Sequence, residues 1–199
     1  LTEPMRTKDP HLTAVQNQLR ETVKTGEFKP IKIVPGVIDH LDNDQMQLAL
    51  LKEFSQQTHD SRILAYTNLR VMQYNDYIRQ IRNLGQEYSI GELLINNNAL
   101  RLKSSMLSIE EGLTIIHQNA NTEDILIERD ISLKVRESTI QTDAGEIFTN
   151  VMIPVDREHF AELVKYYGKC KNWERYFYLK NTFPDFRQRD AATVHKSQG

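Results

Sequence analysis

The sequence predicts an α/β fold that is interrupted by a small antiparallel β-barrel. Two observations support this prediction. In residues 1–89 and 156–199, helical periodicity alternates with short apolar runs, an order typical of α/β domains. In residues 90–155, apolar residues alternate with polar ones or form short runs between turns, as in small barrels. We therefore expect three segments: the first part of an α/β domain (1–89), an inserted barrel (90–155), and a helical return to a last strand of the same domain (156–199).

The composition is typical of a globular protein. Of the 199 residues, 39% are hydrophobic and 26% are charged, and no apolar run is long enough to cross a membrane. The formal net charge of −2 differs from the strongly positive charge expected of a protein that binds nucleic acid over its whole surface. A single groove can still be locally positive. Cys170 is the only cysteine, which excludes a disulfide or a cysteine-based zinc site within the chain and favours a cytoplasmic setting. Because the first residue is not Met, we expect an internal piece of a larger protein.

Two helices are expected before the first buried strand. Asp9-Pro10 supplies a capping carboxylate and a proline at the first helical position, and Gly26 is a suitable stop. Apolar residues at helical spacing between them indicate a side that faces a core, namely Leu12, Val15, Leu19 and Val23. Residues 32–34 predict a short strand ended by Pro35-Gly36. The second helix is expected from about residue 44 to residue 57, with a buried side made of Met46, Leu50, Leu51 and Phe54.

A strand and a helix follow. Residues 63–66 are a short apolar run bounded by polar residues, which favours a buried parallel strand. The helix beyond Thr67-Asn68 is expected to end near Gly85 and to carry its apolar residues on one side, namely Val71, Tyr74, Ile78 and Ile81.

The inserted segment shows its clearest pattern between residues 125 and 135. Apolar residues share one side there, namely Ile125, Ile127, Ile131, Leu133 and Val135. This alternation predicts a half-buried strand or a pair of strands. Asp143-Ala144-Gly145 supplies a turn before the next apolar run, residues 147–153.

Helices are expected again from residue 156. Asp156 is the predicted cap, Pro184 ends the helical region, and Asp190-Ala191 leads into the final strand. Aromatic residues gather on these helices between lysines and arginines, namely Tyr166, Tyr167, Trp173, Tyr176 and Tyr178. Such rings can stack on bases, but their helical spacing favours packing against the core.

The most informative motif is the last seven residues, Thr193-Val194-His195-Lys196-Ser197-Gln198-Gly199. Hydroxyls, an ammonium group and backbone amides are the groups that bind a phosphate. The heptapeptide resembles motif V of superfamily 1 helicases of the RecD-like and Dda-like kind. Upstream, Leu1-Thr2-Glu3-Pro4-Met5-Arg6 resembles motif IV of that family, and Arg62-Ile63-Leu64-Ala65-Tyr66-Thr67-Asn68 resembles the strand and loop that follow it. Residues 90–95 are similar to the opening of the family's SH3-like insertion, and Lys171-Asn172-Trp173 to the helical return from it.

The resemblance implies a fold and a set of roles. The fold is the second RecA-like domain of the helicase, incomplete here, with an SH3-like barrel inserted. Arg6 becomes an arginine finger at the γ-phosphate of ATP, the alternative being an ordinary surface arginine. Thr67 and Asn68 contact the DNA backbone, cap the next helix, or do both. The remaining DNA-backbone residues are Thr193, His195, Lys196 and Ser197, while Gln198 and Gly199 lie closest to the nucleotide. As an alternative, His195 is a satisfied core histidine; it has no companion at metal-ligand spacing.

The resemblance also implies what the complete enzyme does and what this part lacks. The complete enzyme is an ATP-dependent DNA helicase that moves 5′ to 3′ along single-stranded DNA, with ATP and Mg²⁺ as cofactors. The printed sequence contains no P-loop and no magnesium-binding acidic motif, so this fragment alone is expected to bind neither cofactor and to be inactive. Its expected partners are single-stranded DNA, the first RecA-like domain and a replication or recombination protein. No association with a membrane is expected. The rival interpretation is a non-enzymatic module whose barrel binds a protein or single-stranded nucleic acid.

Overall fold

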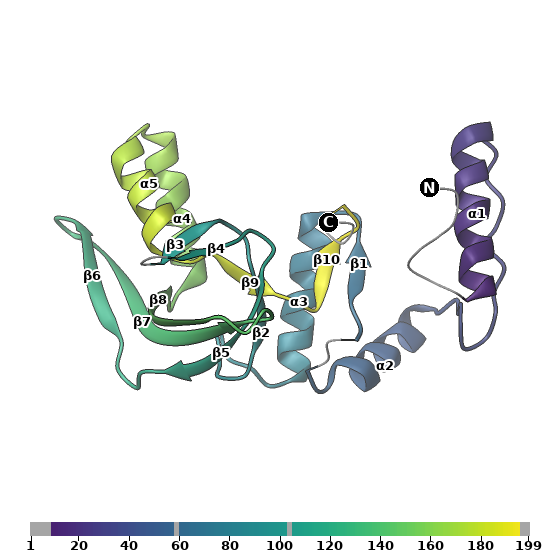
Figure 1. Ribbon diagram of the computed structural model, residues 1–199, viewed down its shortest axis with the longest axis horizontal. Coiled ribbons are helices and arrows are strands. Elements are labelled where there is room, and N and C mark those ends of the chain that lie inside the picture. Colours follow the sequence, from purple (N-terminus) through teal and green to yellow (C-terminus); the bar gives the residue numbers. More distant parts are fainter. Residues whose placement is uncertain (1–8, 58–59, 103–104, 196–199) are drawn as a thin grey trace. The chain divides into compact units, whose positions relative to one another are not determined.

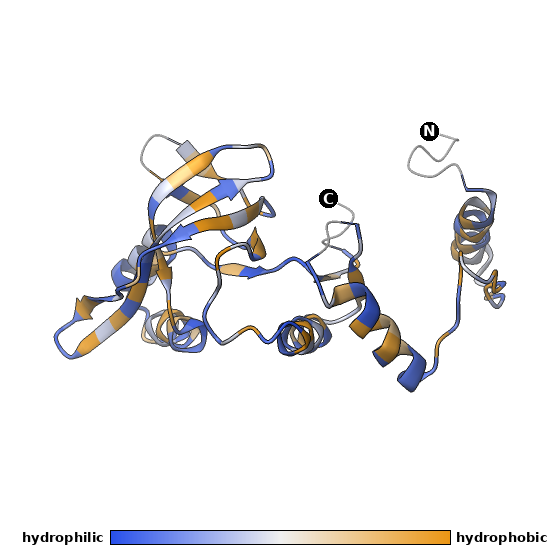
Figure 2. Ribbon diagram, turned by 90° about the horizontal axis from the view of Figure 1, so that it is seen from below, coloured by the Kyte–Doolittle hydropathy of each residue, from blue (hydrophilic) through white to orange (hydrophobic). Residues whose placement is uncertain are grey.

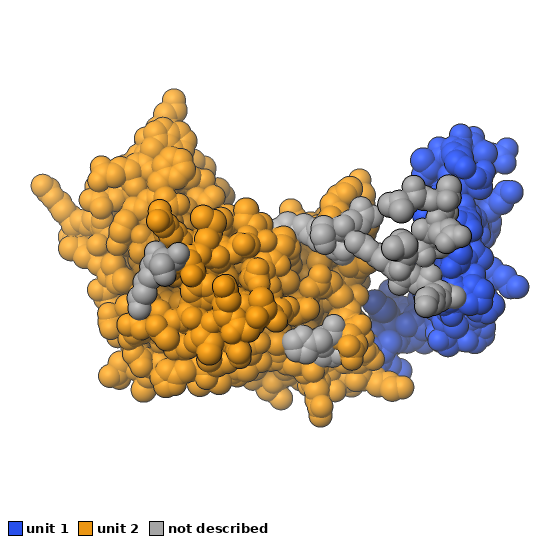
Figure 3. Space-filling view, viewed as in Figure 1, with its two compact units in different colours: residues 1–49 blue, residues 50–199 orange. Residues whose placement is uncertain are grey.

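The computed structural model describes residues 9–57, 60–102 and 105–195 (Figure 1). The chain divides into two compact units, Leu1–Ala49 and Leu50–Gly199 (Figure 3). The predicted site residues Arg6, Lys196, Ser197, Gln198 and Gly199 lie outside the described residues.

The first unit is organised by α1 (Pro10–Thr25). Both predicted helix ends are confirmed: the Asp9 carboxylate accepts hydrogen bonds from the backbone N–H of His11 at 2.8 Å and of Leu12 at 3.0 Å, and Gly26 ends the helix with φ 74°. The prediction that one side of α1 faces a core is wrong, because none of its residues is buried and Val23 is 87% exposed. Local capping signals form a helix here although the described residues bury none of its apolar side chains.

The predicted strand at residues 32–34 is also wrong. The only pairing in this stretch, within the described residues, is an isolated bridge between Val34 and Ile38 across a turn at Gly36. Helix α2 (Asn43–Phe54) then begins in the first unit and ends in the second. Leu50 and Phe54, one turn apart, are buried as predicted, whereas Leu51 is exposed because it lies about 100° around the helix from Leu50.

The second unit contains a parallel strand pair covered by a helix. β1 (Ile63–Ala65) pairs in parallel with β10 (Ala191–Thr193), and α3 (Asn68–Ile81) packs against both strands. The parallel pairing confirms the sequence prediction. The predicted burial of this strand is confirmed for Ile63 and Ala65. Leu64 between them is 52% exposed, so only one face of the strand is buried. The elements between α3 and β10 form a second structure, which is therefore inserted in the sequence between the two paired strands.

That second structure is a curled antiparallel sheet resembling half a barrel (Figure 1). Its strand order is β6-β7-β5-β2-β9, and β8 also pairs with β7. The strands are β2 (Leu93–Asn96), β5 (Gly112–Gln118), β6 (Glu123–Glu128), β7 (Ile131–Thr142), β8 (Ile147–Pro154) and β9 (Phe186–Gln188). A small hairpin, β3 (Leu100–Leu102) and β4 (Ser105–Leu107), adjoins it. The long strand β7 changes register against both β5 and β8 near its middle, and such bulges allow a sheet to bend.

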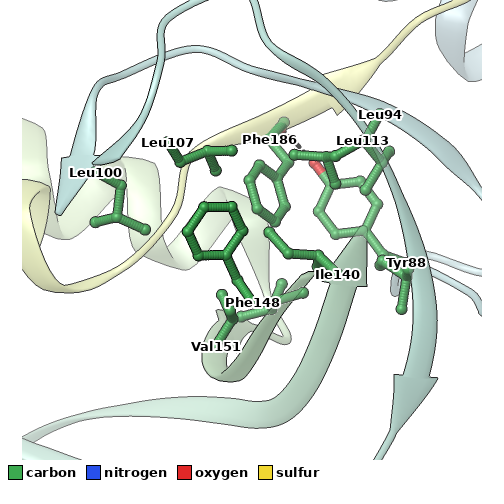
Figure 4. Close-up of a cluster of buried hydrophobic side chains, with 11 residues drawn as sticks. Tyr88, Leu94, Leu100, Leu107, Leu113, Ile140, Phe148, Val151 and Phe186 are labelled. Carbon is green, nitrogen blue, oxygen red and sulfur yellow. Dashed lines mark hydrogen bonds between the residues drawn. The ribbon is translucent and has the colours of Figure 1, made fainter. Parts of the chain in front are cut away.

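Two hydrophobic clusters hold this structure together. One gathers side chains from several strands of the sheet and includes Tyr88, Phe148 and Phe186 (Figure 4). The other packs β6 and β7 against α4 (Arg157–Lys169) and α5 (Trp173–Thr182). The predicted alternation at residues 125–135 is confirmed as the β6–β7 hairpin, and Figure 2 shows alternating hydrophobic and hydrophilic bands along the curled sheet. The predicted turn at Gly145 and the Asp156 cap are also present.

The aromatic residues of α4 and α5 divide into two groups. Tyr167 is buried and Tyr176 packs against the second cluster, which confirms packing for these two rings. Tyr166 and Trp173 are each 52% exposed, and each still contacts a neighbouring ring, Tyr167 at 5.1 Å and Tyr176 at 5.6 Å between ring centres.

Candidate nucleic-acid interface

The parallel pairing of β1 with β10 brings together the predicted contact residues that the structure describes. Thr193 is in register with Ala65, and the Val194 N–H donates to the Ala65 carbonyl at 3.1 Å. Thr67 and Asn68 come two and three residues after the end of β1, and His195 comes two residues after the end of β10. These residues are more than a hundred positions apart in sequence and meet at the carboxyl end of the same two strands, where open α/β sheets commonly bind ligands.

Thr67 performs the capping role that the sequence left open. Its backbone is extended, and its Oγ1 accepts a hydrogen bond from the Arg70 N–H at 3.3 Å. The hydroxyl still has its own hydrogen to donate, so capping and phosphate binding are compatible. Asn68 is the exposed first residue of α3.

Asn68 and Thr193 line a groove of about 480 Å³. Its walls come from α3, the ends of β2 and β10, β9 and the start of α4. The full lining is Asn68, Val71, Met72, Asn75, Asp76, Asn97, Arg157, Glu158, Ala161, Arg187, Gln188 and Thr193. Thr67 and His195 are exposed near this edge but are not part of the lining. The groove therefore combines one wall from the parallel pair with another from the curled sheet.

Sequence reasoning missed the two arginines of this groove. Arg187 lies on β9, a three-residue strand that was not predicted, because a stretch this short shows no period in the sequence. Arg157 follows the correctly predicted cap Asp156, but nothing local in the sequence indicates that this helix start faces α3.

The two arginines differ in how far their charge is neutralised. Arg187 donates through Nε to Asn97 Oδ1 at 2.9 Å and forms an ion pair with Glu110. Arg157 forms no ion pair with any carboxylate of the described residues; its guanidinium lies 4.8 Å from the centre of the Tyr88 ring. With its amide oriented to present oxygen, Gln188 accepts from Arg157 Nη1 at 2.8 Å. The direct partners of Arg157 are thus neutral, and the carboxylates of Glu92 and Asp76 act on its charge only at longer range.

Tyr88 is one of those neutral partners. Burial raises the pKa of Tyr88 from its ordinary 10.0 to about 12, with Arg157 opposing the shift. Its hydroxyl donates to the carbonyl of Phe186. The phenol therefore stays protonated at neutral pH and does not cancel the charge of Arg157.

The groove also contains two carboxylates, Asp76 and Glu158. Its surface is therefore mixed in charge, with amides and a hydroxyl between the charged groups. Such a surface suits hydrogen bonding to a ligand backbone better than long-range attraction of an anion, in keeping with the net charge of −2.

Two buried ion pairs fix the walls of the groove. Arg82 at the end of α3 binds Asp190 through two hydrogen bonds of 2.9 and 2.7 Å, just before β10 begins. Arg79, one turn earlier, pairs with Glu92, next to β2. In addition, Asn75 Oδ1 accepts from the Ala191 N–H at 2.9 Å. Helix α3 is thereby tied both to the parallel pair and to the curled sheet.

The residues that the resemblance assigns to ATP (Arg6, Gln198 and Gly199) lie outside the described part of the chain. The described residues contain no group of three or more His, Cys, Asp or Glu side chains suited to a metal ion. Among the same residues, no helix combines the length and apolar character needed to span a membrane. Comparisons of the chain with protein-family models and with curated proteins found no match.

Proposed function

We propose that this chain is the part of a superfamily 1 DNA helicase, similar to the Dda-like branch, that holds the backbone of single-stranded DNA. In this proposal the β1–α3–β10 frame belongs to the second RecA-like domain, and the curled sheet is its SH3-like insertion. The observation that carries the proposal is the β1–β10 pairing, since it places Thr67 and Asn68 at the same edge as Thr193 and His195.

The chemistry of this edge suits phosphate contacts. Hydroxyl and amide side chains on a fixed scaffold can donate to phosphate oxygens without reading sequence. Thr193 and Asn68 supply these groups from the groove, and Lys196 and Ser197 continue the motif in the sequence. The complete enzyme would bind ATP and Mg²⁺, close two RecA-like domains over them and move 5′ to 3′ along the strand, with Arg6 at the γ-phosphate.

The first test measures binding of the 199-residue chain to fluorescein-labelled oligo(dT) by fluorescence anisotropy. Thr193→Val and Asn68→Ala each remove one donor at the edge and should each weaken binding about tenfold, because a hydrogen bond to a charged group contributes about 1.5–3 kcal/mol. Thr149→Val is the matched control, since Thr149 is exposed on β8 and does not line the groove. Equal affinities for all four proteins would refute the assignment of the edge.

A second test uses the salt dependence of the same binding. Lys196→Ala should reduce the slope of log K against log salt by about 0.7, the value for one phosphate contact on a single strand. An unchanged slope would remove Lys196 from the interface. In the complete enzyme, Arg6→Ala should abolish ATP turnover and retain DNA binding, and wild-type turnover in that variant would remove the finger assignment.

The rival interpretation, a non-enzymatic binding module, predicts a different result. The reading frame of the complete protein would then contain no P-loop upstream of residue 1, and oligo(dT) binding, if present, would be insensitive to changes at Asn68 and Thr193. A P-loop upstream together with sensitivity at both positions would reject it.

A further inference from the structure

A second hollow of about 260 Å³ adjoins the groove across α4. It is separate from the β1–β10 edge and belongs to the curled sheet, α4 and α5. Its lining is Tyr88, Asn98, Pro154, Arg157, Phe160, Ala161, Val164, Lys180, Pro184, Asp185 and Phe186. Arg157 and Ala161 line both the hollow and the groove, so the two are neighbours that share one wall.

The hollow has apolar walls and a small number of polar groups at its margin. Phe160, Val164 and Phe186 supply the apolar surface, together with two prolines. This combination of apolar walls and a few placed polar groups is typical of sites for small molecules. A volume of about 260 Å³ lies just below the roughly 300–1,000 Å³ of ligand pockets, which suits one small group rather than a longer molecule.

The charges of the hollow favour a ligand that carries an anionic group. Arg157 has no ion pair within the described residues, and Lys180 Nζ lies 5.5 Å from the centre of the Tyr176 ring and likewise forms no ion pair there. The carboxylate of Asp185 is already engaged, since its two oxygens accept from Asn97 Nδ2 at 3.3 Å and from Asn98 Nδ2 at 3.1 Å. Two cations thus face the hollow against one carboxylate with partners of its own.

Arg157 lies at the boundary between the groove and the hollow, because it lines both. Its guanidinium rests on the Tyr88 ring and is oriented by the Tyr88 hydroxyl at 3.5 Å and by Gln188 at 2.8 Å. Because its direct partners are neutral and hold it in place, this guanidinium is preorganised to bind a phosphate.

We infer that the hollow binds one nucleotide of the strand that the groove holds, with its base between the apolar walls and its phosphate at Arg157. The inference rests on the proposed function, because the groove must bind single-stranded DNA for the strand to reach α4. It extends the interface from the β1–β10 edge to the curled sheet and assigns Arg157 and the hollow to DNA binding.

The test compares two volume changes at one position on α4. Val164 lines the hollow but not the groove, so Val164→Phe fills the hollow and Val164→Ala enlarges it. Val164→Phe should weaken binding to labelled oligo(dT) about tenfold, because a bound base contributes about 1–3 kcal/mol by stacking. Val164→Ala should stay within about twofold of wild type. Circular dichroism verifies that both variants are folded.

An oligonucleotide with abasic sites in place of the bases separates base binding from backbone binding. Wild type should bind the abasic strand more weakly than oligo(dT), and Val164→Phe should then have no further effect. Arg157→Gln should weaken binding to both strands, since the abasic strand keeps its phosphates. Equal loss in both Val164 variants, or no loss in Val164→Phe, would overturn the inference.

Two further outcomes are distinguishable. If wild type fails to bind oligo(dT) at all, the proposed function falls and the inference falls with it. If oligo(dT) binding depends on Thr193 but not on Val164 or Arg157, the proposed function stands and the inference alone is overturned. Free thymidine monophosphate is the third probe: affinity for it equal to that for the strand would make the hollow a free-nucleotide site and also overturn the inference.

Discussion

The buried pair between Arg82 and Asp190 offers the sharpest test of how the interface is held. Both side chains are only 7% exposed, and the pair joins the end of α3 to the residue before β10. Asp190→Asn keeps the shape of the side chain and removes its charge. The guanidinium of Arg82 then stays buried without a counter-ion.

The expected cost follows from the contacts of Arg82. Removal of one partner from a buried ion pair costs about 3–5 kcal/mol, because the remaining charge has lost its compensation. Arg82 keeps two carbonyl partners, Phe54 at 2.9 Å and Gln56 at 3.3 Å, and the asparagine oxygen can still accept a hydrogen bond. We therefore expect the lower end, about 3 kcal/mol. Such a loss is a large part of the 5–15 kcal/mol that stabilises a typical domain.

Urea unfolding followed by circular dichroism at 222 nm measures this cost. The matched control is Glu87→Gln, which breaks the ion pair of Glu87 with Arg136; Glu87 is 47% exposed, so the cost should be at most about 1 kcal/mol. A destabilisation by Asp190→Asn no larger than that of the control would refute the buried role of the pair. Because Asp190 directly precedes β10, the same variant should also weaken oligo(dT) binding through Thr193.

Two other predictions concern stability. Because burial raises the pKa of Tyr88 to about 12, stability from its protonated form should be complete below pH 10 and be lost as pH rises toward 12, by about 3 kcal/mol at 1.36 kcal/mol per pKa unit. Urea unfolding at pH 8 and pH 11 should show a smaller alkaline loss in Tyr88→Phe than in wild type, whereas the exposed control Tyr66→Phe should lose as much as wild type. Gly112→Ala would place its Cβ 2.2 Å from Asp143 Oδ2 and displace that carboxylate, which pairs with Arg189 at 2.7 Å. We expect a loss of about 1 kcal/mol in urea unfolding, reduced when Asp143→Ala is introduced together with it; an equal loss in both backgrounds would contradict the clash.

The parts of the fold that the sequence predicts well are those set by neighbouring residues. The caps of α1 and α4 depend on Asp9 and Asp156, whose carboxylates bond to amides two or three positions away. The β6–β7 hairpin is visible because its apolar residues alternate within a single stretch. In each case the signal and the structure lie within a dozen residues of each other.

The parts of the fold that the sequence predicts wrongly or misses depend on whether a distant partner exists. β9 pairs with β2 across about ninety residues, and three residues after a proline are too few to show a period. The periodicity of α1 is correct, but a pattern in one helix cannot reveal whether a partner surface exists, and in the described residues Val23 has none. Lys32 to Val34 shows the same limit for strands, since β-propensity without a partner yields only a bridge.

The residues of the candidate site also differ in whether a local stretch of sequence indicates them. Thr67, Asn68, Thr193 and His195 are recognisable because they lie in stretches that resemble helicase motifs, whereas Arg157 enters the groove only through the packing of α4.

The position of Arg157 means that the inserted structure contributes residues to the candidate groove. The groove takes Thr193 and Asn68 from the parallel pair, but it takes Arg157 and Arg187 from the structure inserted between β1 and β10. A shift of the curled sheet against α3 would therefore change the distance between the hydroxyl and amide groups on one wall and the guanidiniums on the other. The contacts that resist such a shift are the Arg79–Glu92 pair and the amide of Gln188, which accepts from Arg79 and Arg157 together. If the groove binds DNA as proposed, the inserted structure forms part of the DNA-binding surface. Its attachment to α3 through Arg79 then sets the distance between the two walls of the groove.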